Sequence, residues 1–133
     1  MSANAVQDGD APGIDPIKDD EFGARGVLEG RRVHLHFWGN ADLRVKDRLD
    51  TFLRQADKLS VEAAVQEVVV DFLRLDFMNS SCLKALVTWL SRVQERPIEK
   101  QYGVVFLKNP AAHWQSRSLH ALATFAPSMI RIE

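Results

Sequence analysis

Two adjacent serines, Ser80 and Ser81, have the residue type and the position to carry phosphate chemistry. They follow a valine-rich run, Val68–Val70, and open a segment whose apolar residues recur at helical spacing. At the N-terminus of a helix the first backbone N–H groups are unpaired and the helix dipole is positive, so an anion is favoured there. A phosphate on such a serine would add nearly two negative charges. The segment therefore predicts a site suited to a phosphorylation switch.

The same residues also have simpler explanations. Asn79, Ser80 and Ser81 are common helix caps, and capping alone would account for their position. Ser81 and Lys84 match the S-x-x-K pattern of acyl-transferring serine enzymes, in which a lysine activates the serine. The Ser-Asp-Asn and Lys-Thr-Gly motifs that complete that machinery do not occur, so we expect no enzyme and no catalytic residue. Lys84 could pair with a phosphate on Ser80 or with Asp76, or it could remain solvated.

Three further side chains could bind a metal or react. His34 and His36 lie two residues apart on one strand face, a spacing more typical of the solvent side of an edge strand than of a metal site. Cys82 is the only cysteine, which excludes an intramolecular disulfide and favours a small buried hydrophobe. A thiol near a helix N-terminus has a lowered pKa, which leaves a redox role open. We expect no metal and no cofactor.

The elements that must position Ser80 alternate between strands and helices. An antiparallel hairpin is followed by helices and strands in the order β-β-α-β-α-β-α-β. The expected segments are strands Phe22–Leu28 and Arg32–Phe37, a break over 38–42, a helix from Val45 to Lys58, a strand at Val68–Phe72, a helix from Asn79 or Ser80 to about Glu95, a strand at Gly103–Leu107, a helix at Trp114–Phe125 and a strand at Met129–Ile132. This order predicts an α/β fold with a mixed, mostly parallel sheet of about five strands and crossover helices.

The length of 133 residues suits one domain. Residues 1–21 are acidic and poor in large apolar side chains, so we expect a flexible tail followed by a domain over 22–133. The start lacks a signal-peptide pattern and no segment is long and apolar enough to span a membrane, which predicts a cytoplasmic protein. A net charge of −1 argues against nucleic acid binding, although the modest positive excess after the tail is compatible with an acidic partner.

Three motifs in order resemble the STAS family of sulphate transporters and anti-sigma factor antagonists. Phe77–Leu83 matches the family's Phe-Met/Ile-Asp-Ser-Ser/Thr-Gly-Leu signature, with Asn79 and Cys82 in place of the Asp and the Gly. The segment 39–42 resembles the Gly-Glu-Leu-Asp turn, and 104–110 resembles the late strand with its Pro-containing loop. The resemblance covers roughly residues 22–133 and implies a STAS-like fold.

The resemblance also implies a function. In the anti-sigma factor antagonists the first serine of the pair is phosphorylated by a kinase that doubles as the anti-sigma factor, and a PP2C-type phosphatase reverses the reaction. Ser80 is then the expected phosphoacceptor and Ser81 the second choice. The expected kinase-facing residues are Asn40, Asp42, Asn79, Ser81 and Lys84.

Two other expectations concern partners. The alternative to a switch is a STAS domain that is never phosphorylated and serves as a scaffold in a larger assembly or transport complex. A weak homodimer is also left open. Trp114 is a candidate partner anchor, because tryptophan is favoured at interfaces.

Overall fold

The computed structural model describes residues 9–133, and it contains six strands and three helices over that range. The elements are β1 (Ile17–Lys18), β2 (Phe22–Glu29), β3 (Arg32–Ala41), the short 3₁₀ helix η1 (Leu43–Val45), α1 (Lys46–Glu62), β4 (Glu67–Met78), α2 (Ser80–Gln94), the 3₁₀ helix η2 (Ile98–Lys100), β5 (Gly103–Leu107), α3 (His113–Phe125) and β6 (Ile130–Ile132). The three predicted helices and the order of the predicted strands are confirmed.

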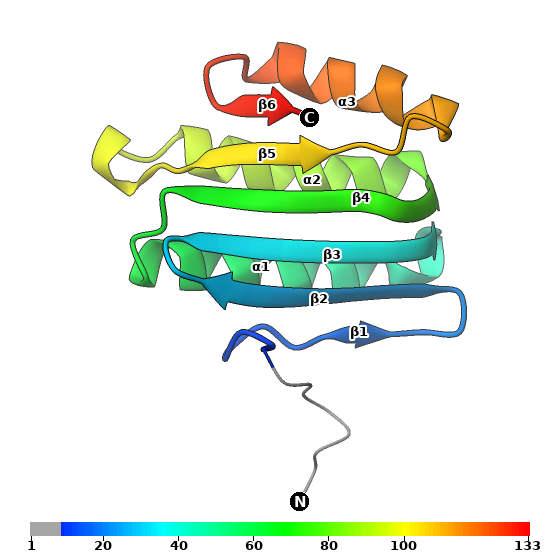
Figure 1. Cartoon of the computed structure of the whole chain (residues 1–133), viewed down its shortest axis with the longest axis horizontal. Coiled ribbons are helices and arrows are strands. Elements are labelled where there is room, and N and C mark those ends of the chain that lie inside the picture. Colours follow the sequence, from blue (N-terminus) through cyan, green and yellow to red (C-terminus); the bar gives the residue numbers. More distant parts are fainter. Residues whose placement is uncertain (1–8) are drawn as a thin grey trace, which may run out of the picture.

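The strands form one sheet in the order β1-β2-β3-β4-β5-β6 (Figure 1). β1, β2 and β3 pair antiparallel, whereas β3 to β6 pair parallel. The predicted mixed and mostly parallel sheet is therefore confirmed, with six strands instead of about five because β1 is added at one edge. The parallel strands all end at the same edge of the sheet, on the right in Figure 1.

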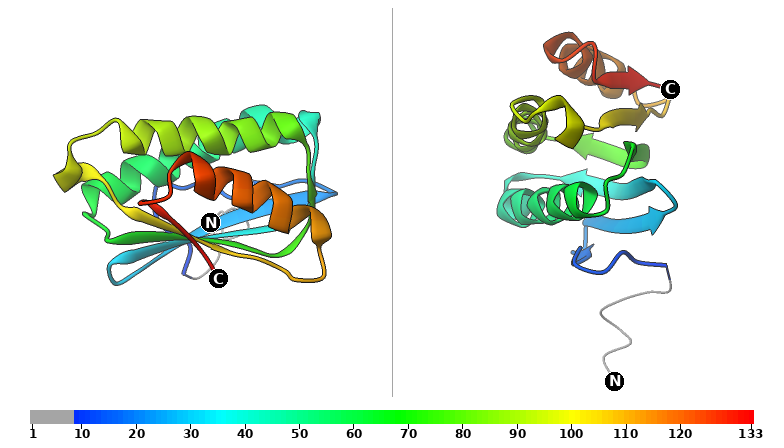
Figure 2. Two further views of the ribbon diagram at one scale, coloured as in Figure 1. Left: turned by 90° about the horizontal axis from the view of Figure 1, so that it is seen from above. Right: turned by 90° about the vertical axis from the view of Figure 1, so that its left-hand side faces the viewer.

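All three helices cover one face of the sheet and leave the other face open (Figure 2). On the covered face the rings of Phe37, Phe72 and Phe106 form a continuous row, with centroids 5.6 Å apart in each neighbouring pair. No helix in residues 9–133 is long and apolar enough to cross a membrane. The strict alternation from Arg32 to Phe37 in β3 matches this one-sided packing, because every second side chain of this part points to the helices.

A buried polar cluster joins α1 and α2 to the residue that precedes β5. The carboxylate of Asp57 on α1 accepts hydrogen bonds from the Tyr102 hydroxyl at 2.6 Å and from the Arg96 guanidinium at 2.7 Å. The Tyr102 oxygen also accepts from the Trp89 indole N–H at 2.8 Å. Burial raises the pKa of Tyr102, and the neighbouring Asp57 carboxylate raises it further.

The packed domain begins earlier than the predicted boundary at Phe22. Ala11, Ile14 and Ile17 are each at most 5% exposed, and β1 pairs with β2. Ile14 fits against Gly26, where an added Cβ would come within 2.8 Å of the Ile14 side chain. A few well-spaced apolar residues thus anchor this acidic segment to the domain. The average composition of the segment does not reveal them, because most of its residues are polar or small. The remainder of the predicted flexible tail, residues 1–8, lies outside the described residues.

β3 and β4 run further than predicted, up to the edge of the sheet that carries Ser80. β4 ends at Met78 and not at the predicted Phe72. β3 continues through the predicted break to Ala41, with register irregularities between His36 and Trp38 and after Gly39. Gly39 has a φ of +85°, and a Cβ there would lie 2.1 Å from the Glu21 carbonyl oxygen. A glycine therefore lets the chain bend within the strand, where the sequence pattern alone favoured an end to it.

Candidate functional site

Ser80 begins α2 at the edge of the sheet where the parallel strands end (Figure 1). The last residues of β3 and β4, Ala41 and Met78, are paired, and the Asn79 N–H donates to the Ala41 carbonyl oxygen at 2.9 Å. The Asn79 side chain then caps the helix, because its Oδ1 accepts from the Cys82 N–H at 2.9 Å. The start of α2 is thus held to two strands and by its own cap.

The two serines differ in exposure. Ser80 is exposed and Ser81 is partly exposed, and within residues 9–133 neither hydroxyl makes a hydrogen bond. The first turn of α2 contains no acidic side chain. A hydroxyl that is accessible and uncommitted, at the positive end of a helix, can accept a phosphate without losing an existing contact.

The predicted partner residues gather at this edge. Asn40 is exposed and lies opposite Phe77 in the β3–β4 pairing. Asp42 caps η1, where its Oδ1 accepts from the Arg44 backbone N–H at 2.9 Å. Lys84 is exposed on α2, and no ion pair joins it to Asp76 or to another residue in the described part of the chain. The Asp76 pairing considered from the sequence is therefore not formed.

Cys82 is fully buried, as expected for a small hydrophobe. Its Sγ donates to the Asp42 carbonyl oxygen at 3.4 Å, which links the start of α2 to η1. The lowered pKa considered from its position near a helix N-terminus is wrong, because burial raises the pKa of the Cys82 thiol to about 11. The thiol is therefore a packing and linking group in the folded chain.

An apolar rim lies at the same edge of the sheet as Ser80, and of its members only Trp114 was considered from the sequence, as a partner anchor. We define it as Leu43, Phe77 and Trp114. Leu43 is 67% exposed and Phe77 is 48% exposed, although large apolar side chains are usually covered. Trp114 packs against Phe77 with ring centroids 6.1 Å apart, and its indole N–H donates to the Asp76 carbonyl oxygen at 2.7 Å. The sequence signal for this rim was Phe77, an aromatic residue at the end of a strand. That signal alone does not predict exposure, because the direction of the side chain depends on how the strand sits in the sheet.

The two histidines lie on the open face of the sheet. The His36 Nδ1 is 3.0 Å from an Asp71 carboxylate oxygen, and the rings of His34 and His36 stack at 6.2 Å. Over residues 9–133 no group of three His, Cys, Asp or Glu side chains could hold a metal ion. Both histidines are partly exposed, as expected, but β3 is an interior strand and not the predicted edge strand.

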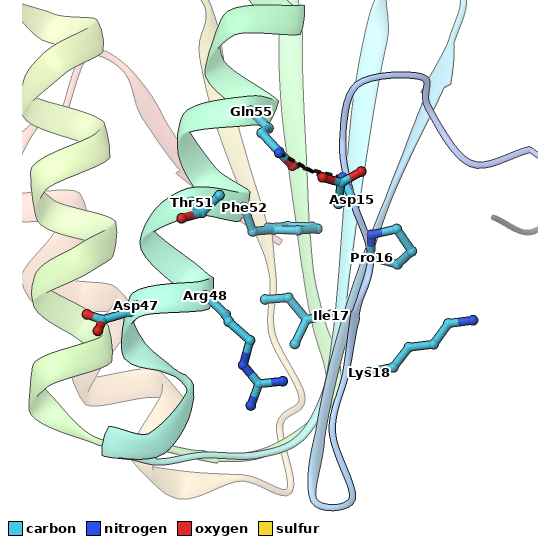
Figure 3. Close-up of a pocket in the computed structure, with 9 residues that line it drawn as sticks. All are labelled: Asp15, Pro16, Ile17, Lys18, Asp47, Arg48, Thr51, Phe52 and Gln55. Carbon is cyan, nitrogen blue, oxygen red and sulfur yellow. Dashed lines mark hydrogen bonds between the residues drawn. The ribbon is translucent and has the colours of Figure 1, made fainter. Parts of the chain in front are cut away.

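A groove of about 660 Å³ lies between β1 and α1 (Figure 3), and no residue of α2 lines it. Ile17 and Phe52 form its apolar floor, and Asp15 and Gln55 close one end with hydrogen bonds of 2.8 and 3.0 Å. Its charged lining residues, two cations and two carboxylates, are balanced, and it contains no Ser, His or Cys. Thr51 is its one lining hydroxyl residue, and in the described part of the chain no hydrogen bond joins that hydroxyl to a side-chain base.

The fold is similar to that of anti-sigma factor antagonists of known structure. One from Mycobacterium paratuberculosis matches with a TM-score of 0.57 at 19% identity, over 86% of this chain and 88% of that chain. The Bacillus cell fate determinant SpoIIAA in the phosphorylated form matches with a TM-score of 0.55 at 16% identity, over 83% of this chain and 90% of that chain. SpoIIAA in its unphosphorylated form matches with a TM-score of 0.51 at 16% identity, over 83% of this chain and 86% of that chain. No family model and no curated protein matches the sequence. The predicted STAS-like fold is confirmed by these structures.

Proposed function

We propose that this chain is a non-enzymatic regulator of the anti-sigma factor antagonist type, and that phosphorylation of Ser80 controls its binding to a protein partner. The observation that carries the proposal is the position of Ser80, which is exposed at the start of α2, at the same edge of the sheet as the exposed side chains of Leu43 and Phe77. The similarity to SpoIIAA supports it, because that protein has been solved in both phosphorylated and unphosphorylated forms.

The physical basis of the switch is a conflict between charge and desolvation. Phe77 lies three residues before Ser80, and Leu43 follows Asp42, whose carbonyl oxygen accepts from the Cys82 thiol in the first turn of α2. A partner that covers these exposed side chains together with the start of α2 would also cover Ser80. A phosphate on Ser80 carries nearly two negative charges, and burying it without new cationic partners costs several kcal/mol. In the free chain the same phosphate stays hydrated and is favoured by the helix dipole. Phosphorylation would therefore disfavour the complex without unfolding the domain.

An acyl-transfer function for Ser81 and Lys84 has little support. Lys84 is exposed, and no hydrogen bond joins its amino group to the Ser81 hydroxyl. A lysine that activates a serine must be held within hydrogen-bond reach of it. We assign no catalytic chemistry to this pair.

The partners of such a switch would be a serine kinase that acts as the anti-sigma factor and a PP2C-type phosphatase.

A scaffold that is never phosphorylated is the second candidate function, and one observation favours it. The buried side chain of Cys82 fills a position where the STAS signature has glycine. Neighbouring genes for a histidine-kinase-like serine kinase or a PP2C-type phosphatase would favour switching, whereas genes for transporter subunits would favour the scaffold.

The direct test is the intact mass of the chain after incubation with the candidate kinase and ATP. We expect the wild type and Ser81→Ala to gain one phosphate and Ser80→Ala to gain none. A wild type without phosphate, or a Ser80→Ala variant that gains as much as the wild type, would refute the assignment. Lys84→Ala tests whether that side chain contributes to kinase recognition. An unchanged rate of phosphorylation would show that Lys84 is only a surface residue.

The binding surface can be tested separately with the unphosphorylated chain. Phe77→Ala should weaken the affinity for the partner at least tenfold, because it removes the exposed aromatic ring of the apolar rim. Ile98→Ala is the matched control, since Ile98 is 78% exposed on η2, far from Ser80 in the sequence and on another element. Equal loss of binding in both variants would place the partner elsewhere.

A further inference from the structure

Cationic side chains gather in the groove between α1 and α2. Two adjoining hollows, of about 440 and 170 Å³, share Arg54 and Arg92, so one groove passes between these two residues. Six cations and three carboxylates line it. The cations are Lys46, Arg54, Lys58, Arg92, Arg96 and Lys100.

Internal ion pairs consume only part of this charge. Lys46 binds Asp50 at 2.8 Å, and Arg96 binds Asp57 in the buried polar cluster. Within the described range 9–133, no ion pair involves the four other cations of the groove, and Glu62 is the only carboxylate of the groove left without one. The groove therefore keeps a positive excess in a chain whose formal net charge is −1.

We propose that the α1–α2 groove binds a short acidic segment of a partner protein. Charge complementarity is the basis, since four uncommitted cations from α1, α2 and η2 face one hollow. The stripe from Lys46 to Lys58 on α1 is about 18 Å long at 1.5 Å per residue, which an extended peptide of about six residues would span. The net negative chain and the carboxylates within the groove disfavour a long polyanion such as nucleic acid.

Arginine is suited to such an occupant. Its planar guanidinium can bind a carboxylate with two parallel hydrogen bonds, and Arg54 and Arg92 approach the groove from opposite helices. An acidic side chain between them could be held from both sides. Leu53 and Ala85 lie buried beneath the groove and fix the spacing of the two helices that carry these arginines.

The proposal is independent of Ser80 and can be tested without a kinase. An isotope-labelled full chain is titrated with an eight-residue peptide of alternating glutamate and alanine, and binding is followed by amide chemical shifts. We expect shifts concentrated in α1 and α2 around Arg54 and Arg92, a weaker affinity at higher salt, and no shifts with the glutamine analogue of the peptide.

Matched charge reversals make the test specific. Arg54→Glu with Arg92→Glu should weaken peptide binding at least tenfold. Arg74→Glu with Arg117→Glu, which changes the net charge equally at two exposed arginines that do not line the groove, should change it less than twofold. Arg54→Gln with Arg92→Gln provides a milder pair if the reversal lowers stability. Absence of binding by the wild type, equal loss in both double variants, or tighter binding of single-stranded DNA or anionic vesicles than of the peptide would overturn the proposal.

Discussion

Replacing Asn79 tests whether the cap of α2 is as important as its geometry indicates. The Asn79 Oδ1 accepts the Cys82 N–H at 2.9 Å, and this N–H is only partly accessible to water. Asn79→Ala should therefore lower the free energy of unfolding by about 1 kcal/mol, the usual cost of losing a helix cap. With an unfolding entropy of roughly 2.1 cal/mol/K per residue, the Tm of the 133-residue chain should fall by about 4 °C.

Asn79→Asp should have the opposite effect. Aspartate keeps an acceptor oxygen at the cap and adds a negative charge at the positive end of α2, where the first turn contains no acidic side chain. We expect a gain of roughly 0.3–1 kcal/mol, equivalent to a rise in Tm of about 1–4 °C.

Thermal and urea unfolding followed by circular dichroism measure both changes. Ser81→Ala is the control, because its side chain makes no hydrogen bond in the described structure, and its stability should stay within about 0.5 kcal/mol of the wild type. The reasoning fails if Asn79→Ala melts within 1 °C of the wild type, or if Asn79→Asp is the less stable of the two variants.

Three further predictions concern packing and ionisation. Gly39→Ala should lower the free energy of unfolding by at least about 2 kcal/mol in urea titrations, because of its positive φ and a backbone oxygen 2.1 Å from the new Cβ, whereas Gly30→Ala, with an open surrounding, should cost about 1 kcal/mol. Cys82 should react with iodoacetamide at pH 8 at least about 100-fold more slowly in the folded chain than in denaturant, because a pKa of about 11 in place of 9.0 leaves about 100-fold less thiolate. The raised pKa also means that stability falls as the pH rises from about 9 to 11, since the unfolded thiol ionises first. Tyr102→Phe should lower the free energy of unfolding by about 1.5–3 kcal/mol, because it removes a buried hydrogen bond to the Asp57 carboxylate. Because Tyr102 is the only tyrosine and its pKa is raised, tyrosinate absorbance should appear above pH 10 only as the chain unfolds, and a folded chain with full tyrosinate absorbance would contradict this.

The local sequence patterns predicted most of the fold correctly. The alternation of Val33, Leu35 and Phe37 gave the half-buried strand β3, and the helical spacing after Asn79 gave α2 with its start at Ser80. These patterns are reliable because the side-chain periods of strands and helices are properties of the backbone itself. The position of Ser80 at a strand-to-helix junction follows from the same local signals.

The errors arose where distant segments meet. Ile14 and Ile17 are anchored by β2, and Gly39 bends β3 against the Glu21 carbonyl, so neither the early start of the domain nor the length of β3 is visible in a local window. The pKa of Cys82 was misjudged for the same reason, because its burial depends on packing from η1 and the sheet.

The sequence by itself determined the class of fold, the strand-to-helix junction and the residue at its tip, Ser80, because backbone periodicity and capping are local. Only the tertiary structure decided what surrounds that residue. It brought the apolar rim to the edge of Ser80 from three separate segments. It also brought Arg54 and Arg92, which are 38 positions apart in the chain, to one groove from two helices. The exposure of a side chain and the local charge around it depend on its neighbours in space. Many of these neighbours come from distant segments, so neither property can be read from the local sequence.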